Sequence, residues 1–484
     1  MNVVYILSDR HNPEFSGCYG NSITRTPNMD QLAEAGTRFE SAYCVSPLCA
    51  ATRAAMMSGR YVHEIGAWDN TSAYTGVPKG WGHFFREKGV LLTTIGKLDF
   101  RPDGDHGIED ERMPSHRENL DVMALFREDP VLPRVQYLHR LRDAGPSDSL
   151  RGHSRDFRAA DEAVRWLKAD RPSERPWVLV VNFSNLHKWT PPRDLWDHYD
   201  PLIRSENLDE RYTEDLEHLH PFHKAFARYS NAEYIQPEEV RRGVVGYHAS
   251  VEILDGHIGR VLDALEETGI REETLVVYGA DHSGNCGEHR IEDHGGLYEE
   301  SIRVPLLFSG PGGQTGQVVR DPVSMLDVFP TICEAVGLES AQHMRGVSLL
   351  DLIQGNSGAQ IPAFTLSEYH ADGFPGSGFA LRSGPWKYVE CVGERPMLFH
   401  LADDPYEMHD LVVQDDPGVQ DTLIKLRTML CKICSPEAVD ARAKADQRAL
   451  RDRLAKSGRL DRELKRRGFM LTSEGLQHTD AFLP

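Results

Sequence analysis

The chain of 484 residues has little that would suit it to membranes, nucleic acids or an oxidising compartment. No apolar run approaches the roughly 20 residues of a membrane span. Lys and Arg number 54 against 74 Asp and Glu, and the net charge of −20 disfavours nucleic acids and anionic membrane surfaces. Eight scattered cysteines do not resemble a disulfide framework. Residues 2–8 follow Met1 without a basic leader, which predicts a cytoplasmic protein.

Apolar segments alternate with helical patterns over much of the chain. Strands are expected at 2–8, 177–183, 274–279 and 304–308, and helices near 28–35, 156–168 and 237–268. This alternation predicts an α/β fold with a mostly parallel sheet sandwiched by helices.

Ligand sites in such sheets lie beyond the carboxyl ends of the strands. Residues 9–12, 184–188 and 280–283 each follow a strand, so these three loops are expected to converge. The segment 100–155 is poor in periodicity and is expected to form a long loop over the site.

The pattern changes after residue 360. Short strand-like pieces divided by Gly, Pro and charged turns predict a small antiparallel sheet, followed by helices from about 417. We therefore expect a catalytic α/β domain at 1–360 and a smaller domain at 361–484. The charged stretch 436–468 is expected to be a solvated or subunit-contacting helix, compatible with a homo-oligomer.

Cys49 is the most informative residue. Pro47 suits a turn, residues 50–57 are mostly helix formers, and Gly59 suits a helix end, so Cys49 should begin a helix. Helix N-termini attract anions, and Arg53 lies one turn later on the same face. This combination favours a tetrahedral sulfate or phosphate group. The alternative is a buried structural cysteine.

A second group of residues suits a divalent cation. Asp281 and His282 follow a strand, and Asp9 follows another, so carboxylates and an imidazole should meet at one sheet edge. Calcium or magnesium would suit the oxygens, and manganese the mixed set.

The block from Ser46 to Arg60 around Cys49 resembles the modification signature of the sulfatase family. The segments 1–60, 247–310 and 382–388 are also similar to this family, the last to its choline-sulfatase-like members. The resemblance implies an alkaline-phosphatase-like fold and hydrolysis of a small anionic sulfate ester. It also implies formylglycine made from Cys49 by a maturation enzyme, and one divalent metal, Ca²⁺ first, with Mg²⁺ or Mn²⁺ as alternatives.

The resemblance carries roles onto particular positions. Cys49 becomes the precursor of the nucleophile and a metal ligand, and Arg53 holds that nucleophile. Lys97 contacts the sulfate, and His187 protonates the leaving oxygen. The remaining metal ligands are Asp9, Asp281 and His282. The substrate-binding residues are Asn70, His294 and Asp99.

Several positions depart from the family pattern. Arg10 stands where a potential ligand is usual, Asp99 replaces a histidine, His294 a lysine and Ser283 a glycine. Three alternatives therefore stay open: a phosphonate monoester or phosphodiester hydrolase, a catalytically silent anion-binding homologue, and a thiolate enzyme in which His187 acts as base on unmodified Cys49.

Overall fold

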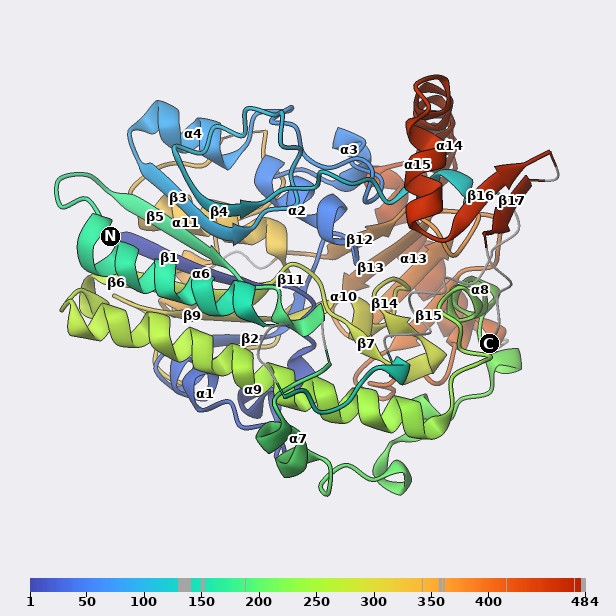
Figure 1. Cartoon of the computed structure of the whole chain (residues 1–484), viewed down its shortest axis with the longest axis horizontal. Helices are drawn as coiled ribbons and strands as arrows, with labels where there is room; N and C mark the ends of the chain where they lie inside the picture. Colours follow the sequence, from blue (N-terminus) through green and yellow to red (C-terminus); the bar gives the residue numbers. More distant parts are fainter. Residues whose placement is uncertain are drawn as a thin grey trace.

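A computed structural model describes residues 1–128, 141–148, 153–187, 189–341, 343–356, 359, 362–414, 416–473 and 475–479. Within these residues nine strands form one sheet, with the order β10-β2-β9-β6-β1-β5-β3-β4 and with β11 beside β2 (Figure 1). All neighbours are parallel except that β9 runs antiparallel to β2 and β6. The strands are β1 Asn2–Ser8, β2 Thr37–Tyr43, β3 Leu91–Lys97, β4 Asp110–Ser115, β5 Trp177–Asn182, β6 Thr274–Ala280, β9 Arg303–Ser309, β10 Gln317–Val319 and β11 Val323–Ser324.

Helices cover both faces of this sheet, as the alternating pattern predicts. Along β1, Val4 and Ile6 pack into one core with α1, α6 and α9, while Val3, Tyr5 and Leu7 pack into the other with α2, α4 and α11. Alternate side chains therefore serve opposite cores, which explains why the strand is apolar throughout. The helices are α1 Pro27–Glu34, α2 Cys49–Ser58, α4 Trp81–Lys88, α6 Ser154–Arg165, α9 Pro237–Glu267 and α11 Val328–Ala335.

A second, antiparallel sheet follows residue 360, in the order β12-β13-β14-β15. Its strands are β12 Thr365–Tyr369, β13 Gly378–Ser383, β14 Trp386–Cys391 and β15 Met397–His400, and α13 Pro417–Ile433 comes next. These elements confirm the predicted secondary structure. The two-domain division at 360 stays a prediction, because the two sheets share one hydrophobic cluster and residues 360 and 361 lie outside the described part.

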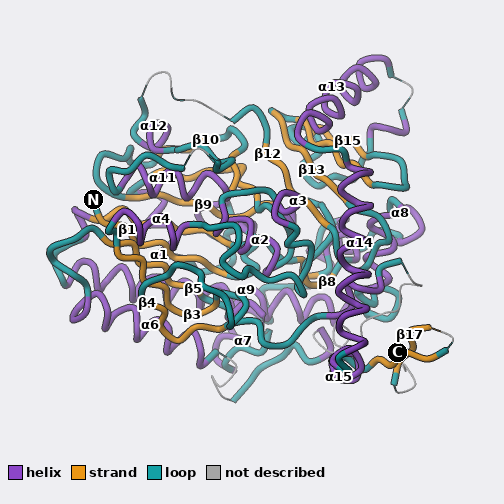
Figure 2. Tube along the Cα trace, turned by 90° about the horizontal axis from the view of Figure 1, so that it is seen from above, coloured by secondary structure: helices purple, strands orange, loops and turns teal. Residues whose placement is uncertain are grey.

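Two expectations were only partly right. The described part of 100–155 is not one long loop, because β4 extends the main sheet and a short 3-10 helix, η3 (Val122–Phe126), is buried. The charged stretch 436–468 is helical as predicted but forms two helices, α14 (Pro436–Lys456) and α15 (Arg459–Arg466) (Figure 2). Both are largely exposed to solvent, and their apolar residues pack on η3. Leucines spaced along this charged stretch, such as Leu454, Leu460 and Leu464, pack against η3 of the same chain.

Within the described residues, no helix is both long and apolar enough to span a membrane. All eight cysteines are free thiols, in agreement with their scattered spacing.

The centre of β1 should dominate the stability of the fold. Ile6 is fully buried, so we expect Ile6→Ala to lower the free energy of unfolding by about 2–5 kcal/mol through lost burial and a residual cavity. The matched control is Ile424→Ala on α13, where the side chain is 65% exposed and the change should stay within about 0.5 kcal/mol. Thermal unfolding midpoints measure both; equal midpoints for the two variants would contradict this account.

Candidate active site

Four neighbouring strands of the main sheet place polar residues, at or just after their carboxyl ends, along one edge of the sheet. Asp9 follows β1, Asp281 follows β6, Lys97 ends β3 and Asn182 ends β5. Backbone bonds tie the loops together, since Asp9 N donates to the carbonyl of Phe183 and Asp281 N to that of Ser8. The predicted convergence of residues 9–12, 184–187 and 280–283 is confirmed; residue 188 lies outside the described part.

Cys49 is the first residue of α2, and Gly59 ends the helix in the left-handed region at φ 67°, as the sequence predicts. Leu48 before it is extended and offers no side-chain cap. Asn70 takes up part of that role, because its Oδ1 accepts from the Ala50 amide at 3.1 Å. Asn70 therefore lies at the helix start beside Cys49.

Asp9, Cys49, Asp281 and His282 form one buried cluster in which the potential ligand atoms all lie within 4.8 Å of one another. The sulfur of Cys49 lies 3.1 Å from His282 Nε2 and 3.6 Å from Asp9 Oδ1. His282 Nδ1 lies 2.6 Å from the Ser283 carbonyl, which can only accept. Nδ1 must therefore carry a proton, and Nε2 faces the cluster, where its neutral form would offer an electron pair to a cation. Two carboxylates, an imidazole and position 49 fit a divalent cation.

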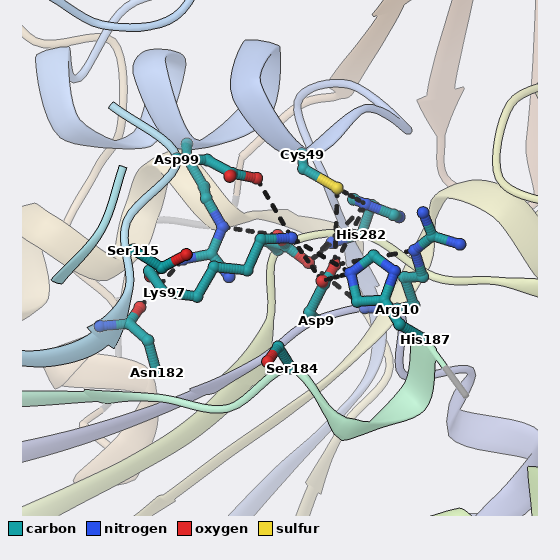
Figure 3. Close-up of polar contacts among 12 residues, drawn as sticks. Asp9, Arg10, Cys49, Lys97, Asp99, Ser115, Asn182, Ser184, His187 and His282 are labelled. Atoms are coloured by element: carbon teal, nitrogen blue, oxygen red, sulfur yellow. Dashed lines mark hydrogen bonds and ion pairs between the residues drawn. The ribbon is translucent and has the colours of Figure 1, made fainter. Parts of the chain in front are cut away.

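Arg53 and Lys97 hold the cluster from one side. Arg53 Nε donates to Asp281 Oδ2 at 2.7 Å, and its Nη1 donates to the Lys97 carbonyl at 2.6 Å and to Asn182 Oδ1 at 3.0 Å. Lys97 Nζ contacts Asp9 Oδ2 and lies 3.3 Å from His187 Nε2, which also reaches Asp9 (Figure 3).

The electrostatics favour anionic ligand groups. Burial acts to raise the pKa of Asp9, but His187 and Lys97 beside it hold that pKa well below its usual range. For the Cys49 thiol, burial and Asp9 act to raise the pKa, but Lys97 and His282 together outweigh them, so the pKa is lowered. A carboxylate and a thiol that ionise readily are the forms that coordinate a cation.

The departures from the family pattern lie close to this cluster. Arg10 has φ 63°, and its backbone N–H donates to Asp281 Oδ1 at 3.3 Å while its Nε stays 4.0 Å from Asp9 Oδ1. The ring of His294 stacks on that of His282, with centroids 5.2 Å apart. Asp99 pairs with Lys97 at 3.1 Å and Arg117 at 2.8 Å. The residues Arg10, His294 and Asp99 thus lie in or beside the cluster.

Three supporting residues were missed by the sequence reading. Asn182 positions Arg53, Thr52 Oγ1 donates to the Asp281 carbonyl at 3.1 Å, and Arg117 neutralises Asp99. Asn182 could have been found, because it is the polar end of a strand that was predicted. Nothing in the sequence near Arg117 marks it as a partner of Asp99.

Comparison with known protein families gives two matches, both to sulfatases. The Sulfatase family profile matches residues 1–338, and the profile "N-sulphoglucosamine sulphohydrolase, C-terminal" matches residues 287–435. The chain belongs to the sulfatase family and is thereby a sulfuric ester hydrolase.

Among its relatives are two curated enzymes. The choline-sulfatase of Rhizobium meliloti (strain 1021) is 30% identical over 470 residues, covering 92% of this chain and 89% of the relative. Arylsulfatase K of Danio rerio is 27% identical over 453 residues, covering 89% of this chain and 83% of the relative.

Solved structures share the fold, which is that of alkaline-phosphatase-like sulfatases. Phosphonate monoester hydrolase of Agrobacterium radiobacter has a TM-score of 0.70 at 20% identity and covers 99% of each chain. BT4656, solved with D-glucosamine-2-N,6-O-disulfate, has a TM-score of 0.69 at 19% identity, covering 89% of this chain and 97% of that chain. The predicted family and fold class are confirmed.

If the cluster holds one cation, removing a charged ligand should release it. We expect Asp281→Asn to retain the metal at least about tenfold more weakly than the unchanged protein, because a buried carboxylate is lost. Asp263→Asn, at an exposed position on α9, is the matched control. Metal content after dialysis, measured by elemental analysis, decides the point; equal metal in both variants would place the cation elsewhere.

Proposed function

We propose that this sulfatase-family enzyme hydrolyses sulfate esters with a formylglycine at position 49 and one divalent metal. The observation that supports it best is a cysteine at a helix N-terminus inside a buried carboxylate–imidazole cluster, with Lys97 and Arg53 on one side. The aldehyde hydrate supplies the nucleophile that attacks sulfur. An unmodified structural cysteine would have no need of these charges.

Asp9, Asp281, His282 and residue 49 would hold the metal. Ca²⁺ is the first candidate, with Mg²⁺ or Mn²⁺ as alternatives, because oxygens dominate the donor set. When bound, the metal stabilises negative charge on oxygen and assists formation of the nucleophile. The maturation enzyme that would make formylglycine is the partner this proposal requires. A cytoplasmic location and a homo-oligomer stay predictions.

The remaining residues are proposed to bind the sulfate and to protonate the leaving alcohol. Lys97, at the floor of an open cavity, is placed to bind a sulfate oxygen, and Arg53 holds Asp281 in position. His187 lines the same cavity with a side chain that is 31% exposed. It can therefore reach the ester oxygen and protonate the departing alcohol. The proposed substrate-binding residues are Asn70 at the start of α2, Asp99 in the cavity lining and His294 beside His282.

A phosphonate monoester or phosphodiester hydrolase is the second candidate. Its support is that phosphonate monoester hydrolases are among the structural neighbours, two of them with TM-scores of 0.70 and 0.71 and 99% coverage. Both reactions need the same nucleophile and cation, so only a substrate panel separates them. Whether residue 49 carries a thiol or an aldehyde tests the two remaining alternatives, the catalytically silent binding homologue and the thiolate enzyme.

The peptide that spans Cys49, taken from protein produced in its native host, should carry an aldehyde in place of the thiol. Cys49→Ala should then lower kcat by at least about 10³-fold, because the nucleophile is lost. Cys431→Ala, at an exposed position, should match the unchanged enzyme. Mass spectrometry and sulfate-release assays provide the two measurements; an intact thiol with full turnover would support the thiolate enzyme.

His187→Ala tests the proton donor. A basic leaving alcohol needs protonation and a nitrophenolate does not, so the loss of kcat should be about 10²–10⁴-fold for alkyl sulfates and much smaller for 4-nitrophenyl sulfate. His198→Ala, outside the site on α7 (Arg193–Tyr199), is the control. An equal loss on both substrates would assign His187 to binding or to structure.

A further inference from the structure

Lys97 and His187, which both contact Asp9 of the buried cluster, line a cavity of about 620 Å³. Its other walls come from the residues after β4, from the start of α6 and from the end of α15. The alcohol portion of an ester whose sulfate meets Lys97 would therefore occupy this cavity. Its lining decides which alcohols fit.

The cavity is basic in a chain of strongly acidic composition. Five lining residues are Lys or Arg and two are carboxylates, whereas the chain carries 74 acidic and 54 basic residues. One of the two carboxylates, Asp99, is already paired with Lys97 and Arg117. Burial acts to raise the pKa of Asp99, but Arg117 and Lys97 lower it strongly. Asp99 therefore stays ionised, and its charge is balanced by these two side chains.

Three arginines form the outer wall. Arg155 donates through Nη1 to Ser115 Oγ at 2.7 Å and makes no ion pair within the described part of the chain. Arg466 uses only Nη2, toward Glu463 at 3.2 Å and the Leu120 carbonyl at 3.4 Å, which leaves Nε and Nη1 as donors. Arg467 is anchored by Asp121 at 3.3 Å. Side-chain exposures of 41% for Arg466 and 19% for Arg467 leave both within reach of a ligand.

We propose that the alcohol portion of the substrate carries a second negative charge, which Arg155, Arg466 and Arg467 bind. The inference rests on the proposed ester hydrolysis and adds the substrate class. Guanidinium forks match the planar oxygens of a carboxylate and those of a second sulfate. The tail helix α15 thereby becomes part of the substrate site.

The same lining disfavours a cationic alcohol such as choline. Quaternary ammonium groups are bound by faces of Trp, Tyr or Phe, and no described lining residue of this cavity is one of these. Glu118 is the only lining carboxylate besides Asp99. A choline portion would face three arginines with one carboxylate to compensate.

Kinetics on matched esters test the proposal. We expect kcat/KM for a nitrophenyl sulfate with a ring carboxylate, or with a second sulfate, to exceed that for plain 4-nitrophenyl sulfate by at least about tenfold. Choline sulfate should be the poorest substrate of the panel. Comparing the carboxylate with the second sulfate identifies which anion the wall prefers.

The triple variant Arg155→Gln/Arg466→Gln/Arg467→Gln should bring the dianion-to-monoanion ratio close to one. The control Arg204→Gln/Arg320→Gln/Arg427→Gln removes the same charge at positions that are 67%, 79% and 58% exposed and lie outside this cavity. It should keep both the activity and the ratio. A ratio near one in the unchanged enzyme, a preference for choline sulfate, or an equal loss in the control would overturn the proposal.

Calorimetry separates this inference from the proposed function. Benzenesulfonate, 4-sulfobenzoate and benzene-1,4-disulfonate cannot be hydrolysed, so their binding reports on the cavity alone. Tighter binding of either dianion, lost in the cavity variant, would support the basic wall even if no ester were turned over. Equal binding of all three would overturn it even in an active sulfatase.

Discussion

The structure depends on pairing the buried carboxylates at the end of the main sheet with cationic side chains. Asp9 and Asp281 are fully buried, and a buried charge without a partner costs several kcal/mol. Lys97 and Arg53 provide that compensation from β3 and α2. Because partners come from different elements, α2 and the ends of β1, β3 and β6 must assemble together for any one of them to be stable.

This arrangement also prepares the site for an anion. Arg53 is fixed by three acceptors, so little reorganisation is needed when negative charge arrives. Preorganised cations in a buried site act more strongly than in water. The cations that stabilise the fold are therefore the groups expected to serve catalysis, and a substitution here affects folding and activity together.

The features that could be predicted from the sequence are those that a local pattern of residues encodes. Apolar strands, the helix beginning at Cys49 and the polar residues after strands 1 and 6 follow from periodicity and from the strand-end rule. Strands β2 and β3 were missed because their polar residues break the apolar pattern, and β4 because an edge strand needs little apolar character. Arg117 and the packing of α14 depend on contacts between residues distant in sequence, which no local pattern shows.

The tail illustrates how such contacts change the site. Leu454, Leu460 and Leu464 pack on η3, and this small cluster fixes α15 beside the loop that follows β4. Arg466 and Arg467 are thereby placed across a cavity from Lys97, more than 360 residues earlier in the chain. In a protein of net charge −20, this packing adds two arginines to the lining of a cavity that also holds Lys97. The anchoring of the C-terminal tail, far in sequence from the strand-end cluster, can thus influence which substrates this chain accepts.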